Sequence, residues 1–399
     1  MRTRIATVTM MAALSSMSAA AQAQSSVNIY GLLDVAVGTS RASSGTTIPG
    51  GGTVLASTSS GPRMDSGIGP GGTRFGLKGT EDLGDGLSAS FVLESGFALD
   101  TGSLQQGGLM WGRQAFVALG SKAGWSVSAG RQYTPMNLAI ASSDPSYGFY
   151  WGNPTTNTGF AIYESIGAAP GSGGFGAMGR QDNSILVTGT VGGLTGRLMV
   201  GAGNENARTT GRMINPAIEY TRGPLKVNAS YAMMRQNVEA INATATPEWL
   251  KQFVVGGSYN FGSFTLSSGY YGFNGPKNQA NLSPVATFGS PSASPFAYTW
   301  EKTRSYWIGG RIPVAGGTAI LTATNSRYTY ASGDDGKTTA LMAAYEYPLS
   351  KRTLLYGSIG QVSNNARARS PLVATVSAVL ANGFGSDVRA LSFGMRHTF

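Results

Sequence analysis

The sequence predicts an all-β fold, a transmembrane antiparallel β-barrel of about 16 strands with short turns at one end and long loops at the other. Segments that alternate between apolar and polar residues recur along the whole chain of 399 residues. Charged residues make up only 12% of the chain, about half of the usual share of ~25%. Strands that turn one face to lipid and the other to water would give this balance.

The N-terminus has the pattern of a secretory signal peptide over residues 1–23. Arg2 and Arg4 form a basic head, Ile5 to Leu14 give a mildly apolar stretch, and Ala21-Gln22-Ala23 is a small-x-small cleavage site. We therefore expect one mature domain, 24–399. Loss of the two arginines lowers the formal charge from +10 to +8.

Several other classes of protein are disfavoured. The chain contains no cysteine, so disulfides do not hold the fold. The longest apolar run after the leader, "PLVATVSAVLA" (371–381), is too short to span a bilayer as a helix. Lysine and arginine are dispersed without a dense cluster, and the leader directs the chain out of the cytoplasm, so we expect no nucleic-acid partner.

The first mature segment, 27–38, shows the alternation. One face carries Val27, Ile29, Leu33, Val35 and Val37, and the other carries Asn28, Tyr30 and Asp34. Similar segments, each about as long as a tilted membrane strand needs to be, occur at 87–97, 196–203, 226–234, 264–272 and 353–360.

The connections between these segments alternate in length. Short turns rich in Gly and Asp-Gly, which accept positive φ, fall at 81–86, 121–124, 191–193, 222–224, 261–263, 314–317 and 349–352. Longer irregular stretches include 39–72, 134–179, 273–302 and 365–387. Seven short turns flanked by long loops predict about 16 strands, an even number. In lipid every backbone group must be paired, so the first mature strand should pair with the last.

Aromatic residues gather towards the strand ends, where an amphipathic ring suits a membrane–water boundary. They are Trp111, Trp125, Tyr220, Tyr231, Tyr259, Phe261, Tyr270, Tyr306, Trp307, Tyr345, Tyr347 and Tyr356. A soluble β-sandwich is the alternative, but it would seldom need so many half-polar strands in one chain.

No catalytic or metal-binding constellation stands out. The chain has one histidine, His397, whereas histidine-dependent hydrolysis needs a nucleophile and an orienting acid beside it. The glycine motif "GSGGFG" (171–176) lacks the flanking strand and helix of a dinucleotide site. Zinc would need a cluster of histidine and cysteine. We expect no enzyme activity, no cofactor and no metal.

Several motifs in order resemble one family. The opening "SSVNIYGLLDVAVG", the hairpin "TRFGLKGTEDLGDGLSASFVLESGF", the pair "GRQAFVALG" and "SAGRQYTP", and the end "FGMRHTF" are similar to general diffusion porins of Gram-negative outer membranes, in the β-proteobacterial branch. The resemblance covers nearly all of 24–399. It implies a 16-stranded barrel in the outer membrane, with short periplasmic turns and long extracellular loops. It also implies a homotrimer and a third long loop folded into the lumen.

The resemblance also implies a wall of basic residues facing that loop. The family motifs match Arg74 in "TRFG", Arg113 in "GRQAF" and Arg131 in "GRQY", and Arg180 in "GRQDNSI" is a weaker addition. Lys78 follows Arg74 at even spacing, so both side chains should point the same way. Solvated rim positions are the alternative for each of these residues.

Arg131 has the wrong parity for this role. It falls in step with Trp125, Val127 and Ala129, which should face outward. A bulge near Gly130 would turn its side chain inward.

The third loop, 134–179, contains only two acids, Asp144 and Glu164. Family constriction loops carry several, so the basic wall should dominate and the channel should prefer anions. The expected function is passive diffusion of small hydrophilic solutes and inorganic ions. The alternative is a substrate-selective channel with a saturable binding track.

The chain ends in a strand whose outward residues are Leu391, Phe393, Met395, His397 and Phe399, with Arg396 facing the lumen. The family resemblance makes Phe399, with Phe393 and Met395, the recognition signal for the barrel-assembly machinery. Outer-membrane lipid and lipopolysaccharide are the further partners expected.

Overall fold

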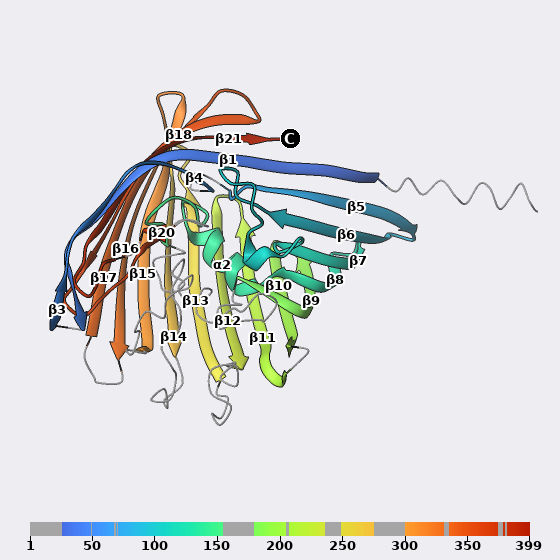
Figure 1. Cartoon of the computed structure of the whole chain (residues 1–399). Coiled ribbons are helices and arrows are strands. Elements are labelled where there is room, and N and C mark those ends of the chain that lie inside the picture. The colour runs from blue at the N-terminus through green and yellow to red at the C-terminus, as the bar shows by residue number, and fades with distance from the viewer. Residues whose placement is uncertain are drawn as a thin grey trace, which may run out of the picture.

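The computed structural model describes residues 26–48, 50–67, 69, 71–154, 179–204, 207–235, 249–274, 300–330, 335–373, 378–379 and 381–399. The predicted signal peptide and Glu164 lie outside these residues. No helix among them is long and apolar enough to cross a membrane. Figure 1 shows one curved sheet in which the first strand runs beside the last.

The elements are β1 (Ser26–Ala42), β2 (Gly45–Ile48), β3 (Gly51–Leu55), β4 (Thr58–Ser66), β5 (Arg74–Gly84), β6 (Leu87–Gly96), the 3₁₀-helix η1 (Gln106–Gly108), β7 (Gln114–Ser121), β8 (Trp125–Tyr133), α2 (Pro135–Ser143), β9 (Arg180–Val191), β10 (Leu194–Asn204), β11 (Ala207–Arg222), β12 (Leu225–Arg235), β13 (Trp249–Asn260), β14 (Thr265–Asn274), β15 (Trp300–Val314), β16 (Gly317–Tyr330), β17 (Asp335–Pro348), β18 (Thr353–Asn364), β19 (Leu372–Val373), β20 (Ala378–Val379) and β21 (Val388–Thr398).

Neighbouring strands pair antiparallel in sequence order from β5 to β18, and β21 then joins β18 to β1. Two strands share the position next to β1 in the barrel. Residues 26–32 of β1 pair with β5, and residues 35–42 pair with β4. Counted in this way, the described strands fill sixteen positions, which confirms the closed antiparallel barrel. The expected loop 39–72 was wrong in part, since it contains β2, β3 and β4.

All seven predicted short turns join strands at one end of the barrel. Two of the turn glycines, Gly124 and Gly193, lie close to the backbone of a neighbouring strand. Gly193 has a φ of 84°, and a Cβ there would lie 2.4 Å from the carbonyl oxygen of Thr221. A side chain at this position would therefore collide with the neighbouring strand as well as strain the turn.

The outer face of the sheet is apolar, as the alternation predicted. In β1, Ile29 is 70% exposed, whereas Asp34 and Ala36 on the opposite face are buried. In β21, Phe393 is 63% exposed. Apolar side chains that remain exposed along whole strands are typical of a lipid-facing surface.

Helix α2 covers part of the inner face. Thr134 caps its N-terminus by accepting a hydrogen bond from the Asn137 amide at 3.1 Å, and Pro135 occupies its first turn. The helix packs on inward side chains from β10 to β15. This buried cluster contains Met136, Ile140, Met199, Met213, Met234, Leu250, Val254, Tyr271, Phe273 and Trp307. Inward positions on these strands are apolar because they receive a helix rather than water.

A second inner cluster forms where the chain beyond α2 reaches β1, β16, β17, β18 and β21. Trp151 is fully buried there. A Cβ on Gly360 would lie 2.1 Å from the Trp151 carbonyl oxygen, and one on Gly38 would lie 2.9 Å from the Trp151 ring. Gly38 therefore leaves space for the indole, and Gly360 leaves space for the backbone of Trp151.

Tyr150 lies beside Trp151 and donates a hydrogen bond from its hydroxyl to Glu346 at 2.7 Å. Burial and the neighbouring carboxylate raise the pKa of the Tyr150 hydroxyl well above its usual value. The hydroxyl therefore stays protonated and keeps donating to Glu346 across the physiological pH range.

The barrel closes at the C-terminal residue. The Gly31 amide donates to the Phe399 carbonyl at 3.1 Å, and the Phe399 amide donates to the Gly31 carbonyl at 3.2 Å. Asp34 lies opposite Arg396 along the same seam. The ring of Phe399 lies over Gly31, where a Cβ would come within 2.3 Å of it. The predicted pairing of the first and last strands is confirmed.

We expect Trp151→Ala to lower the free energy of unfolding by about 3–5 kcal/mol, because a fully buried aromatic ring leaves a cavity that its neighbours cannot fill. Urea unfolding in lipid vesicles, followed by tryptophan fluorescence, measures this. Trp125→Ala is the control, because Trp125 is 40% exposed on the outer face and its loss should be smaller. Equal losses would contradict the buried role of Trp151.

Candidate pore constriction

Glu94 on β6 is the centre of a polar cluster on the inner face. Its carboxylate is buried and lies 2.7 Å from the Arg113 Nε and 3.4 Å from the Arg74 Nε. The Tyr30 hydroxyl donates to the same carboxylate at 3.0 Å. Gly76 makes this convergence possible. It lies opposite both Tyr30 and Glu94, and a Cβ there would come 2.7 Å from the Tyr30 ring.

Tyr133, at the end of β8, extends the cluster to a third arginine. Its hydroxyl accepts from Arg113 Nη2 at 2.7 Å and from Arg180 Nη2 at 2.8 Å. The Arg180 guanidinium also lies 4.5 Å from the centre of the Tyr133 ring, a cation–π distance. We call Arg74, Arg113 and Arg180, together with Tyr30, Glu94 and Tyr133, the arginine cluster. It holds three positive charges and one negative charge.

Lys78 lies on the same face as Arg74. Its Nζ is 5.0 Å from the centre of the Tyr30 ring, and the residue is exposed. Lys78 makes no ion pair within the described part of the chain, so its charge adds to the positive excess beside the arginine cluster.

Arg131 lies apart from the arginine cluster. A bulge is present at this level, but the extra residue is in β9, where Asp182 and Asn183 together face Arg131. Arg131 still pairs opposite Ala115 and keeps the outward parity of its strand. Its Nε donates to the Gly112 carbonyl at 2.8 Å, and its guanidinium forms an ion pair with Asp182. The expectation that a bulge turns Arg131 inward is therefore corrected.

Asp144 follows α2 and is buried, with 1% of its surface exposed. Its carboxylate accepts hydrogen bonds from the Ser146 amide at 2.8 Å, the Ser146 hydroxyl at 2.6 Å and the Gly148 amide at 3.2 Å. These bonds hold the turn after the helix. Asp144 therefore does not present its charge to open lumen. Among the residues that the structure describes, the acid paired with Arg74 and Arg113 is Glu94, which belongs to the same wall.

The chain after α2 is held against strands on the side of the barrel away from the arginine cluster. The Trp307 indole N–H donates to the Ser143 carbonyl at 2.9 Å. Arg311 donates to the Pro145 carbonyl at 3.0 Å and forms an ion pair with Glu346 at 2.7 Å. Residues 134–154 thus lie along the inner face of β10 to β18, and the arginine cluster lies on β1 and β5 to β9.

Sequence reasoning missed Glu94 as a site residue. Its inward parity, shared with Ser88 and Ser90, was visible in the sequence. Its approach to Arg113 depends on the turn before β7, which alternation does not predict.

We expect Glu94→Gln to lower the free energy of unfolding by about 3–5 kcal/mol, because Arg113 would keep its buried charge without a carboxylate. Urea titration of the folded protein in vesicles measures the change. Glu81→Gln removes an exposed carboxylate from the neighbouring strand and should change stability by less than about 1 kcal/mol. A similar small effect at Glu94 would refute its anchoring role.

Comparisons with known proteins agree with this architecture. A family model described as Gram-negative porin matches residues 7–367. An outer membrane porin protein of Bordetella pertussis is 30% identical over 369 residues, covering 86% of this chain and 91% of the relative. Outer membrane porin protein 32 of Delftia acidovorans is 29% identical over 402 residues and covers 96% of both chains.

Solved structures share the fold. The anion-selective porin from Comamonas acidovorans superposes with a TM-score of 0.69 at 24% identity, covering 94% of this chain and 100% of that one. The trimer form of OmpT from Vibrio cholerae has a TM-score of 0.60 at 15% identity, covering 94% and 99%. The closed barrel and the extent of the family match lead to one conclusion: this chain belongs to the Gram-negative porin family and is an outer-membrane channel for passive diffusion.

Proposed function

We propose that the arginine cluster and Lys78 form the basic side of the constriction in an anion-preferring channel. The observation that carries this proposal is the charge balance of the cluster: it contains three guanidinium groups and one carboxylate, which pairs with Arg74 and Arg113, while Arg180 joins through Tyr133. Lys78 adds a further positive charge. Rings of arginine and lysine favour anions in pores because they replace part of the hydration that an anion loses on entry.

The basic residues differ in whether they can contact a passing solute. Arg113 has a side chain only 5% exposed, so it holds Glu94 and Tyr133 in place rather than meeting solutes. Arg74, with a side chain 25% exposed, the partly exposed Arg180 and the exposed Lys78 offer N–H donors to the lumen. An anion passing them exchanges water for these donors, and no bond is made or broken.

We also propose that the third long loop narrows the lumen. Its first part, 134–154, occupies the inner face of β10 to β18 through two buried apolar clusters. Water is then confined to the side that carries the arginine cluster. Low acid content in this loop leaves the positive wall without a strong opposing charge, which supports anion preference.

Arg180→Gln combined with Lys78→Gln should lower the anion-to-cation permeability ratio at least about twofold. A unit charge about 10 Å from the path of an ion changes its energy by about 0.4 kcal/mol in water, and by more where protein excludes water. Reversal potentials in a salt gradient across a planar bilayer measure the ratio.

Arg131→Gln is the matched control, because Arg131 is paired with Asp182 away from the cluster, and we expect its ratio to stay near the wild-type value. A cation-selective wild-type channel would refute the proposal. If Arg131→Gln lowered the permeability ratio as much as the double variant does, the arginine cluster would not be the basic side of the constriction.

The alternative function, a substrate-selective channel with a binding track, differs in one measurable property. A binding track would make conductance saturate and would let one class of solute block it. A general channel would show current proportional to ion concentration with no such block.

We propose that three copies of the chain assemble in the outer membrane, as OmpT of Vibrio cholerae does in its trimer form. We also propose that Phe399, with Phe393 and Met395, is recognised by the barrel-assembly machinery. These three side chains are between 45% and 63% exposed on the outer face of the closing strand, so they are accessible to a partner before the barrel meets lipid.

Deleting Phe399 should lower the yield of folded protein severalfold while leaving the conductance of the pores that do form unchanged. The deletion removes two backbone hydrogen bonds of the seam, each worth about 1 kcal/mol, and the ring over Gly31. The yield is measured by resistance of the folded form to unfolding in gels. Phe261→Ala, at a short turn with 54% exposure, is the control, and a normal yield from the deletion would refute the role of Phe399.

A further inference from the structure

Tyr147 is an exposed aromatic residue in the part of the third loop that lies inside the barrel. It follows the end of α2 by four residues, and 53% of its surface is exposed. The guanidinium of Arg311 lies 5.2 Å from the centre of the Tyr147 ring, a cation–π distance. Arg311 covers one side of the ring, and more than half of the residue remains open.

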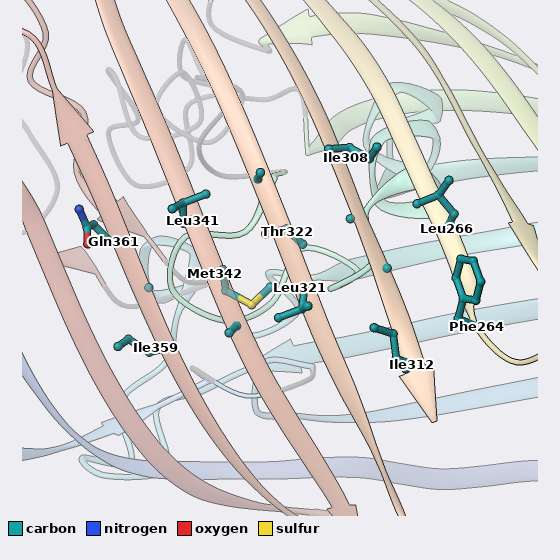
Figure 2. Close-up of a pocket in the computed structure, with 15 residues that line it drawn as sticks. Phe264, Leu266, Ile308, Ile312, Leu321, Thr322, Leu341, Met342, Ile359 and Gln361 are labelled. Atoms are coloured by element: carbon teal, nitrogen blue, oxygen red, sulfur yellow. The ribbon is translucent and has the colours of Figure 1, made fainter. Parts of the chain in front are cut away.

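The strand that carries Arg311 fixes the side of the barrel on which the ring lies. Ile308 and Ile312 of β15 are 51% and 37% exposed on the outer face, and Figure 2 shows both around an apolar groove there. Arg311 has the opposite parity to these two residues, and it donates to the Pro145 carbonyl within the third loop. The open part of Tyr147 therefore meets the water of the lumen.

The backbone holds Tyr147 in a conformation that side chains rarely adopt. Its φ is 57°, in the left-handed region where glycine is the unstrained choice. The Tyr147 amide donates to the Asp144 carbonyl at 2.9 Å, and the Gly148 amide donates to the Asp144 carboxylate at 3.2 Å, which fixes the turn. A half-exposed ring at a strained position adds little to packing, which points to a contact with something in the lumen.

Two further apolar side chains extend the surface that Tyr147 begins. Phe149 follows Tyr147 by two residues, and Leu354 has inward parity on β18, opposite to that of the exposed Leu355. Phe149 and Leu354 are partly buried and pack against the same inner cluster around Trp151. We call Tyr147, Phe149 and Leu354 the apolar shelf.

The strand register places the apolar shelf close to the arginine cluster. Leu354 pairs opposite Arg396 of β21, and Arg396 pairs opposite Asp34 of β1. Two residues along β1, Leu32 pairs opposite Arg74 of β5. Leu354 and Arg74 are thus three strands apart, with roughly 15 Å between their backbones. Both side chains point inward, so one small solute can lie near both.

The positive excess lies at the arginine cluster and not at Arg311. Arg311 forms an ion pair with Glu346 at 2.7 Å, and the Tyr150 hydroxyl donates to the same carboxylate at 2.7 Å. The wall beside Tyr147 therefore offers an aromatic surface whose cation is already neutralised. The arginine cluster and Lys78 offer the charge. A solute that uses both must be an anion with a flat apolar part.

We propose that the apolar shelf makes the channel prefer aromatic carboxylates among small organic anions, with Tyr147 as the residue that determines this specificity. The ring of the solute stacks on Tyr147, and its carboxylate is directed to Arg74, Arg180 and Lys78. Stacking favours a flat ring over a saturated ring of the same size. The attraction is weak, so it eases entry and still lets the solute leave without blocking the current. The inference rests on the basic side of the constriction proposed above and names the class of anion that it favours.

Reversal potentials across a planar bilayer test the proposal with the folded protein. Sodium chloride on one side is opposed by sodium benzoate or by sodium cyclohexanecarboxylate on the other, at about pH 8, where both carboxylates are ionised. The two anions have the same charge and similar size, but only benzoate has a flat aromatic ring. In the wild type, the permeability to benzoate should exceed that to cyclohexanecarboxylate at least about twofold.

Variants of Tyr147 separate the ring from the backbone that carries it. Tyr147→Gly removes the ring and suits a φ of 57°, so the turn is kept and the benzoate preference should fall to about onefold. Tyr147→Leu should lose the preference as well, because it is apolar without a ring. Tyr147→Phe keeps the ring and should keep the preference. Tyr306→Leu is the matched control, because it removes a ring that is 58% exposed on the outer face, and the preference should stay.

The outcomes distinguish the apolar shelf from the anion preference on which it rests. Arg180→Gln combined with Lys78→Gln should lower the permeability to both carboxylates relative to sodium and leave their ratio near the wild-type value. Equal permeability of the two carboxylates in an anion-preferring wild type would overturn the shelf alone. So would a benzoate preference that survives both Tyr147→Gly and Tyr147→Leu, or one that Tyr306→Leu removes equally. A cation-preferring wild type would overturn the anion preference and the shelf together.

Discussion

The structure depends on the requirement that every backbone N–H and C=O in the bilayer finds a partner within the protein. A sheet satisfies this only when it has no free edge, so each strand must have two neighbours. The requirement explains why β4 and β5 share one position beside β1 and why the last residue is paired. Side chains are then free to differ sharply between the two faces, since the backbone alone maintains the ring.

The inner face of the barrel is covered by packed side chains on one side and left polar on the other. Methionine, tyrosine and tryptophan side chains of β10 to β15 bury α2, and Trp151 fills the space left by Gly38 and Gly360. Close packing of this kind is stiff. The wall with Arg74, Arg113 and Arg180 is left as the polar side, and its shape is kept by Glu94 and Tyr133 rather than by solvent.

Much of this could be predicted from sequence because period-two alternation and turn glycines are local signals. The parity of Val27 to Val37 and the seven short turns required no knowledge of distant partners. The strand Thr58–Ser66 was missed because its serine, glycine and proline residues suit a loop, and only pairing with β1 makes it a strand. Long-range register of this kind leaves no local pattern.

The site was predictable to the same degree. The family motifs selected Arg74, Arg113 and Arg180, which lie together in the arginine cluster. The bulge expected to turn Arg131 inward is in β9 and not in its own strand. A bulge can be expected from sequence, but which of two paired strands carries it depends on both. Glu94 was overlooked for a similar reason, since the sequence shows an inward carboxylate but not which arginines lie beside it.

The seam between Gly31 and Phe399 has a consequence for the timing of folding. All other neighbours in the barrel are closer together in sequence, so their pairing closes shorter loops. The seam joins β1 to β21, which are the paired strands of the described barrel that lie farthest apart in sequence, so it has the largest loop-closure cost and should form late. Until these two strands pair, the sheet keeps two open edges that can pair with another chain.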